Sequence, residues 1–458
     1  MKQLRVLLVL VVAVSLILTA CQPAATEPAA EEPTAGDNTE AEVPAAEEPA
    51  TEEEQIVLEY WSMWNEPEPQ AMAIQKWIDA FEAENSNITI NVTWNGRENQ
   101  TKLRSALAAG TVVDFMDQDA DQVAGGLMAE GLGYPLDDYL QQTALDEDVT
   151  VAETFVPGVL DLHKLSEHYY LFPYVYNTWQ FWTNMDILAE VGVTEEPQTW
   201  EEFLAMAQKV KDAGYNVLAA EGGEFSYNFP YYAYMVERIK GPGFLLAAVE
   251  DKTGESWNDP VFLEAAQMVR QLWDLGYIPA DTVGYVWPAG QMTLAVGDST
   301  MEMCGSWLPT ELRDTAGEDF NWGGLRFPAV EGGEGSIDDL TAWLLSFMIM
   351  KDSEHPDAVF EFLKFTQTQA NAQIMANEAM VGVTRKGVSW VEGIKDGETA
   401  SANANVALLP NDGIQALYPE YQETVLTPAY NSFFQLETTP EEFINQMVEG
   451  TKSYWESH

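Results

Sequence analysis

The sequence predicts an α/β protein whose folded body contains two lobes. Predicted strands and helices alternate from residue 56 onward, and the same alternation starts again near residue 169. Residues 55–458 are about 400 residues, a length that can bury two hydrophobic cores. The composition, 46% hydrophobic and 11% aromatic, is typical of a globular protein. Two α/β units in one chain leave a cleft between them, where small-molecule sites often lie.

Residues 1–20 have the pattern of a secretory signal peptide. Lys2 and Arg5 precede an apolar run over residues 6–18, which is shorter than the roughly 20 residues of a membrane span. A single transmembrane anchor is the alternative. The run ends at Cys21, and the spacing resembles the lipobox of bacterial lipoproteins, in which the cysteine carries the lipid. We therefore expect lipidation at Cys21, which would anchor the mature protein to a membrane.

Residues 21–54 are expected to form a disordered tether behind the lipidated cysteine. Residues 22–54 contain 11 acidic residues and no basic ones, so they cannot bury enough apolar surface to offset the entropy of ordering. Their prolines and like charges favour an extended chain. An acidic tail that binds a partner is the alternative.

The first α/β unit consists of a strand, a helix, a strand, a helix and a strand. Apolar residues alternate in the strands, and Ile74, Trp77 and Phe81 lie on one face of the first helix. The second helix ends at Gly110, and the whole pattern indicates a mainly parallel sheet covered on both faces. The expected ranges are 56–61, 70–84, 87–94, 101–110 and 112–118.

The second unit begins with an aromatic, strand-rich segment and continues with helices that have clear ends. Thr199 and Glu202 have the spacing of a capping box. Asp259 is the expected N-cap of a later helix, with Pro260 at its first position. The expected ranges are 169–184 for the strand segment and 199–214, 259–276 and 439–456 for the helices.

The composition narrows the classes of ligand and cofactor that the protein is expected to bind. The formal net charge of −53 argues against nucleic-acid binding, which requires clustered lysine and arginine, and it disfavours an anionic substrate. Only Cys304 remains as a thiol in the folded body, which suits an exported protein without disulfides. We expect no cofactor.

Five motifs in one order resemble a known family, the type 1 extracellular solute-binding proteins of ABC importers, which includes maltose- and oligosaccharide-binding proteins. The motifs are "EYWSMWNEP…IDAFEAENSNITINV" (59–92), "KLRSALAAGTVVD" (102–114), "FPYVYNTWQFWTNMDILAEVGVTEEPQTWEE" (172–202), "MEMCGSW" (301–307) and "HPDAVFEFLKF" (355–365). The resemblance covers nearly all of residues 56–455. The segment "DLTAWLLSFMI" departs from the family's usual glycine-rich pattern.

The resemblance implies a two-lobed periplasmic-binding-protein-like fold (type II) with an interlobe cleft and a hinge that the chain crosses several times. We place the crossings near Pro173, near Gly305 and after Met350. The expected lobes are 55–172 plus 305–350 for lobe 1 and 173–304 plus 351–458 for lobe 2. Ligand would bind between the lobes and shift them toward the closed form.

The resemblance also implies the function. The chain is expected to be the monomeric substrate-binding lipoprotein of an ABC importer, and to deliver a neutral carbohydrate of oligosaccharide size to the permease transmembrane subunits. It would lie outside the cytoplasm, held by its lipid at the cell surface or in the periplasm, and would not be an enzyme. A secreted two-carboxylate glycoside hydrolase and a surface carbohydrate adhesin are the alternatives.

A sugar has apolar faces and a rim of hydroxyl groups, so its site needs aromatic rings with carboxylates or amides. Candidates follow the first and third strands at their carboxyl ends, where open α/β sheets bind ligands. Further candidates lie at the expected crossings and in a segment, 226–232, that looks like a loop, and the family resemblance implies Arg385 as a polar contact. The candidates are Trp64, Asn65, Glu66, Asp119, Asp121, Tyr174, Asn177, Trp179, Asn228, Tyr231, Trp307, Trp343 and Arg385.

Several candidates have a structural alternative. Trp64 could cover the first helix, and the alternation near Trp179 could bury a ring in the second lobe. Asp119 and Asp121, with Asp117, also have the spacing of calcium ligands, but the glycine and glutamate that an EF-hand loop needs at 122 and 128 are missing. We therefore expect no metal.

Overall fold

The computed structural model describes residues 55–458. The expected signal peptide, lipidation site and tether lie outside the described residues. Within the described part of the chain, every helix is too short or too polar to span a bilayer.

The strands form one mixed sheet in the order β2-β1-β3-β8-β4-β6-β5, with β7 on β4 and β9 on β8. The pairs β1–β2, β1–β3, β5–β6 and β8–β9 are parallel, whereas β3–β8, β4–β6, β4–β7 and β4–β8 are antiparallel. The strands are β1 (Ile56–Ser62), β2 (Ile88–Trp94), β3 (Phe115–Asp119), β4 (Leu171–Asn184), β5 (Asn216–Ala219), β6 (Ser299–Gly305), β7 (Trp322–Leu325), β8 (Asp339–Ile349) and β9 (Val406–Leu408).

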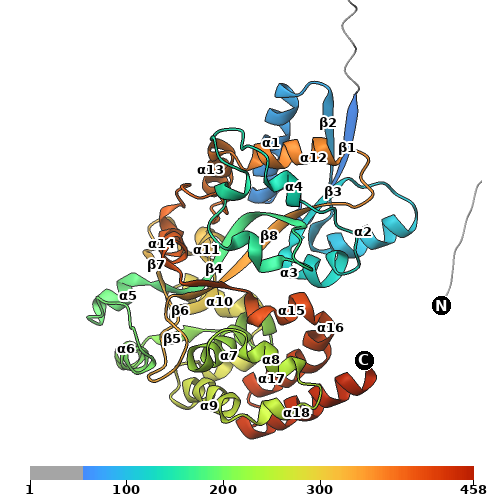
Figure 1. Cartoon of the computed structure of the whole chain (residues 1–458). Helices are drawn as coiled ribbons and strands as arrows, with labels where there is room; N and C mark the ends of the chain where they lie inside the picture. The colour runs from blue at the N-terminus through green and yellow to red at the C-terminus, as the bar shows by residue number, and fades with distance from the viewer. Residues whose placement is uncertain (1–54) are drawn as a thin grey trace, which may run out of the picture. The chain divides into compact units, whose positions relative to one another are not determined.

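Helices cover this sheet (Figure 1). They are α1 (Pro69–Glu84), α2 (Asn99–Ala108), α3 (Ala120–Val123), α4 (Asp137–Leu140), α5 (Met185–Glu190), α6 (Trp200–Asp212), α7 (Phe225–Lys240), α8 (Phe244–Glu250), α9 (Pro260–Asp274), α10 (Ala289–Ala295), α11 (Leu308–Ala316), α12 (Pro356–Thr366), α13 (Gln369–Glu378), α14 (Lys395–Asn403), α15 (Ile414–Leu417), α16 (Pro419–Tyr421), α17 (Thr427–Phe434) and α18 (Pro440–Ser457).

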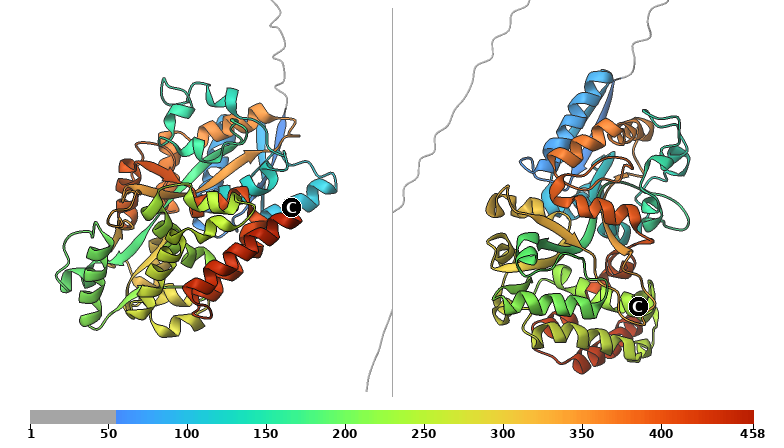
Figure 2. Two further views of the ribbon diagram at one scale, coloured as in Figure 1. Left: turned by 60° about the horizontal axis from the view of Figure 1, so that its bottom comes forward. Right: turned by 90° about the vertical axis from the view of Figure 1, so that its left-hand side faces the viewer.

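Two clusters of buried apolar side chains give the body its two lobes. The first cluster includes Leu58, Ile74 and Phe115, and so covers the sheet segment that was predicted from strand and helix alternation. The second includes Phe203 and Phe443, on helices of the second unit. The long helix α18 lies along the edge of the second lobe (Figure 2).

The two clusters cross the expected lobe boundaries in several places: Leu325, expected in lobe 1, belongs to the second cluster, and Cys304, expected in lobe 2, belongs to the first. The sequence assigned all of 351–458 to lobe 2, but Phe360 on α12 and Met375 on α13 belong to the first cluster. Figure 1 shows α12 and α13 beside α1, at the end of the body that holds β1 to β3. The chain therefore returns to the first lobe after β8, because apolar faces of α12 and α13 pack there.

Helix ends follow the sequence closely. The Thr199 side chain accepts a hydrogen bond from the backbone N–H of Glu202, and the Glu202 carboxylate accepts one from the backbone N–H of Thr199, which forms the expected capping box of α6. Asp259 caps α9 by accepting from the backbone N–H of Val261. The segment 226–232, in contrast, is not a loop but lies within α7, despite Pro230. Burial of its aromatic rings in the second core outweighs the hydrogen bond that the proline removes.

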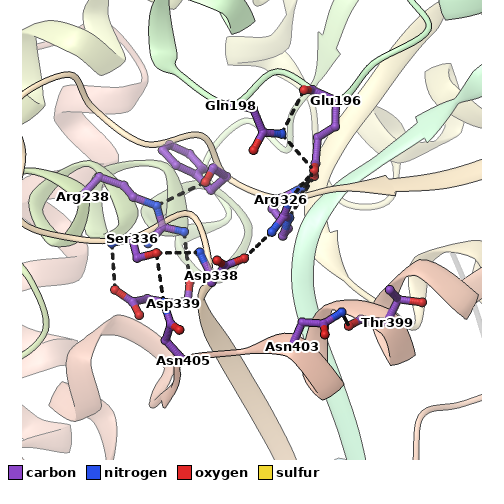
Figure 3. Close-up of polar contacts among 11 residues, drawn as sticks. Glu196, Gln198, Arg238, Arg326, Ser336, Asp338, Asp339, Thr399, Asn403 and Asn405 are labelled. Atoms are coloured by element: carbon purple, nitrogen blue, oxygen red, sulfur yellow. Dashed lines mark hydrogen bonds and ion pairs between the residues drawn. The ribbon is translucent and has the colours of Figure 1, made fainter.

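Several hydrogen bonds and ion pairs hold the loop that joins β7 to β8 (Figure 3). Arg238 on α7 is 1% exposed, and its guanidinium donates to the carbonyl oxygens of Phe327 (3.2 Å) and Asp339 (3.0 Å). It also pairs with the neighbouring Glu237. Nearer the surface, Arg326 pairs with Glu196 and Asp338. These bonds fasten both ends of the loop to the second lobe.

Candidate functional site

A cleft of about 550 Å³ lies where the two lobes meet, within the size range of small-molecule sites. The ends of β1 and β3 contribute to it from the first lobe, α7 contributes from the second lobe, and α11 contributes as well. β4 and β8, which join the lobes, supply its floor of apolar residues. The lining residues are Met63, Trp64, Glu68, Pro69, Gln70, Arg97, Asp119, Gln122, Val175, Asn177, Trp179, Ser226, Tyr227, Trp307, Thr310, Glu311, Trp343, Leu345, Val381, Gln415 and Gln422.

Trp64 follows the end of β1 and is held by a chain of buried hydrogen bonds. Its Nε1 donates to the hydroxyl of Tyr174 (2.8 Å), which donates to Asp117 Oδ2 (2.7 Å). Tyr60 donates to the other oxygen of Asp117 (2.8 Å). The guanidinium of Arg97 lies 4.6 Å from the centre of the Trp64 ring. Tyr174, a predicted contact, is therefore buried outside the cleft and orients the tryptophan that does line it.

This arrangement makes a prediction about stability. Tyr174→Phe should lower the free energy of unfolding by about 1–3 kcal/mol, because it leaves a buried oxygen of Asp117 and the indole N–H of Trp64 without a partner. Urea denaturation measures the change. Tyr231→Phe is the matched control, since the Tyr231 hydroxyl is equally buried but has no hydrogen-bond partner among the described residues. A loss of the same size in both variants would contradict the role given to Tyr174.

Arg97 and Glu68 form an ion pair at the rim of the cleft, at 2.7 Å. Burial opposes ionisation of Glu68, but hydrogen bonds from Arg97 and Asn65 outweigh it and hold the pKa of this carboxyl below its usual value. Asn65 and Glu66, both predicted contacts, are exposed and do not line the cleft. Asn65 instead donates to Glu68 through its side chain.

Asp119 is the last residue of β3 and caps α3, where its Oδ1 accepts from the backbone N–H of Gln122 (2.9 Å). It is 4% exposed and lines the cleft. Burial, together with the nearby carboxylate of Asp121, raises the pKa of Asp119 to about 8. Asp121 points elsewhere and bonds to Nε2 of the buried His163 at 2.6 Å. Only the first of these two predicted carboxylates therefore reaches the cleft.

Three tryptophans from three elements meet on the lobe-joining side of the cleft. The ring centres of Trp179 and Trp307 lie 5.3 Å apart and nearly perpendicular, at 89°. Those of Trp307 and Trp343 lie 4.9 Å apart, at 60°. Gly305 makes this packing possible, since a Cβ added there would lie 1.9 Å from the Trp307 ring. The nearby Asn177 also lines the cleft and accepts from Ser306 Oγ (3.1 Å).

The remaining predicted contacts lie away from the cleft. Asn228 is fully buried and donates to the carbonyl oxygen of Glu221 (2.9 Å). Tyr231 packs in the second core. Arg385 is 1% exposed and bonds to Glu147 at 2.6 Å, on the first lobe. Each of these side chains instead contributes to the packing or hydrogen bonding of the fold.

Sequence reasoning also missed residues that line the cleft. Glu311 lies four residues after Trp307 on the same side of α11, a spacing that could have revealed it. Tyr227 lies in the segment 226–232, for which the sequence predicts a loop. Gln415 and Gln422 come from the C-terminal part of the chain, and no local pattern marks them.

Glu302 on β6 is a buried acid close to Glu221 and Glu311. It is 1% exposed, and neither of its carboxyl oxygens has a hydrogen-bond partner among the described residues. Burial, reinforced by the two nearby glutamates, raises the pKa of Glu302 well above its usual value. The folded protein thus holds this proton more tightly than the unfolded chain, and the stability that this provides is lost as pH rises above about 4.5.

Glu302→Gln is therefore expected to raise the free energy of unfolding near pH 7 by about 1–3 kcal/mol, because glutamine can be buried without the proton uptake that glutamate requires at this pH. The gain should shrink toward pH 4, where glutamic acid is protonated in both states. Thermal unfolding across this pH range measures the effect, and the exposed Glu456→Gln is the control. A gain that did not depend on pH would contradict the explanation.

Comparison with known proteins identifies the family to which the chain belongs. A family model described as "Bacterial extracellular solute-binding protein" matches residues 66–373. The chain belongs to this family.

Individual relatives agree with this assignment. A "Putative binding protein" of Brucella abortus (strain 2308) is 26% identical over 352 residues, which are 75% of this chain and 80% of the relative. A structure titled "Chitin oligosaccharide binding protein" has a TM-score of 0.68 at 22% identity and covers 87% of this chain and 98% of its own. RafE of Streptococcus pneumoniae, solved with raffinose, has a TM-score of 0.67 at 17% identity and covers 87% and 99%. These similarities confirm the two-lobed fold, and the family is one of extracellular binding proteins.

Proposed function

We propose that this solute-binding protein captures a carbohydrate of oligosaccharide size and delivers it to an ABC permease. The observation that carries the proposal is the set of Trp179, Trp307 and Trp343 in a cleft that also presents carboxylates and amides. Flat rings suit the apolar faces of sugar units, and Asp119 and Asn177 supply acceptors for hydroxyl groups. Structurally similar proteins are named for chitin oligosaccharide and raffinose, which supports this ligand class.

The proposal includes attachment of the body to a membrane. The sequence around Cys21 supports lipidation there, and a tethered binding protein would keep its captured ligand near the permease. Mass spectrometry of the mature protein should find diacylglycerol on Cys21. Release of Cys21→Ala into the medium would agree with that result, whereas an unmodified N-terminus would contradict it.

A thermal-shift screen against mono- and oligosaccharides tests ligand capture. A ligand present at 100 times its Kd should stabilise the folded protein by about 2.7 kcal/mol. The same incubations should release no reducing ends. Release of reducing ends would instead support a glycoside hydrolase, and a screen without any stabilising sugar would contradict the proposal.

A further inference from the structure

The charged side chains that line the cleft are unequally divided. Three are acids, Glu68, Asp119 and Glu311, whereas Arg97 is the single base among the described residues that line it. Arg97 is already paired with Glu68 at 2.7 Å. Asp119 and Glu311 therefore face the cleft without an ion-pair partner among its lining residues, although Arg97 is near enough to counteract part of the rise that burial causes in the pKa of Glu311. The protein's strong overall negative charge adds to the negative potential there.

The two acids differ in a way that matters for a ligand. Glu311 is exposed and lines the cleft, so an incoming group can reach its carboxylate, although desolvation raises the pKa of this group. Asp119 is 4% exposed, and its burial beside Asp121 disfavours the ionised form of its carboxyl group. Asp119 is therefore suited to a sugar hydroxyl group, and Glu311 is the carboxylate that a cation in the cleft would meet.

The aromatic residues add a second preference for a cation. Trp307 and Glu311 lie one helical turn apart on α11, so the carboxylate stands next to the tryptophan cluster. Trp307 is nearly perpendicular to Trp179 and tilted by 60° from Trp343. Ring faces that point in several directions, beside a carboxylate, attract an ammonium group.

We infer that the cleft selects a carbohydrate that carries a protonated amine, an amino sugar in place of the neutral sugar that the sequence favours. This inference rests on the proposed function. The sugar rings stack on tryptophan, and the ammonium group lies against Glu311. The ion pair contributes an attraction that the corresponding hydroxyl group cannot provide.

Ligands that differ in a single group test the inference. Cellotriose, chitotriose and the glucosamine trimer share ring and linkage and differ at carbon 2 by a hydroxyl, an acetamido and an ammonium group. The pairs glucose and glucosamine, galactose and galactosamine, and mannose and mannosamine extend the test to other rings. In calorimetry at low salt and near neutral pH, we expect at least one amine to bind ten-fold or more tighter than its hydroxyl counterpart. This preference should weaken in 0.5 M salt.

Glu311→Gln should remove most of the preference for the amine while leaving the affinity for the hydroxyl counterpart nearly unchanged. Asp314→Asn is the matched control, because Asp314 is an exposed acid on the same helix that does not line the cleft. Equal affinities within every pair, or a preference that persists in Glu311→Gln, would overturn the inference while leaving sugar capture intact. If neutral sugars and amino sugars all fail to bind, both the inference and the proposed function are wrong.

Discussion

Gly305→Ala is expected to weaken sugar binding at least ten-fold, a loss of about 1.4 kcal/mol. The added Cβ would lie 1.9 Å from Cζ3 of Trp307, closer than such atoms ever approach. The Trp307 ring cannot absorb this by a small shift, because Trp179 and Trp343 pack against it. The ring must leave its position, and the stacking surface is lost. Isothermal titration with a sugar from the screen measures the change.

Two variants make this result interpretable. Trp307→Ala should lower the affinity by a similar or larger factor, since it removes the ring itself. Gly284→Ala is the control, because a Cβ there meets open space and the backbone conformation suits any residue. If Gly305→Ala bound sugar as well as the unmodified protein, the tryptophan cluster would not be the stacking surface.

Arg238→Met should cost about 3–5 kcal/mol of stability, because it leaves the buried carboxylate of Glu237 without its partner. It also removes the donors that hold the carbonyl oxygens of Phe327 and Asp339, at the two ends of the loop between β7 and β8. Urea denaturation, followed by circular dichroism, measures the loss.

Arg313→Met provides the comparison for a surface ion pair. Arg313 pairs with Glu318 at 2.9 Å, but the two side chains are 48% and 82% exposed. Exposed pairs contribute about 0–1 kcal/mol, so this variant should unfold at nearly the same urea concentration as the unmodified protein. Equal losses in the Arg238 and Arg313 variants would mean that burial does not decide the effect.

Local signals were sufficient to predict much of the fold. The apolar face of α1 and the capping box of α6 depend on residues within one or two helical turns, so periodicity and spacing reveal them. The location of α12 and α13 did not follow from such signals. Their apolar faces would fit either core, and only the complete packing shows that they join the first lobe.

The sequence predicted only some of the residues that line the cleft, because local signals do not separate core residues from binding residues. Of the predicted contacts, those that line it are Trp64, Asp119, Asn177, Trp179, Trp307 and Trp343. An aromatic ring serves a core as well as a binding site, so Tyr174 and Tyr231 could not be assigned from sequence alone. Arg385 was also ambiguous, since its partners Asp146 and Glu147 are more than 200 residues away along the chain.

The packing of Trp179, Trp307 and Trp343 should give the protein an exciton signal in circular dichroism. The chain has 15 tryptophans, so its fluorescence is a sum over many environments. Exciton coupling in circular dichroism instead arises between rings in close contact. In the described part of the chain, the tryptophan–tryptophan pairs in ring contact are Trp179 with Trp307 and Trp307 with Trp343. The resulting couplet would report on the cleft alone, so occupancy could be followed without a dye or a label.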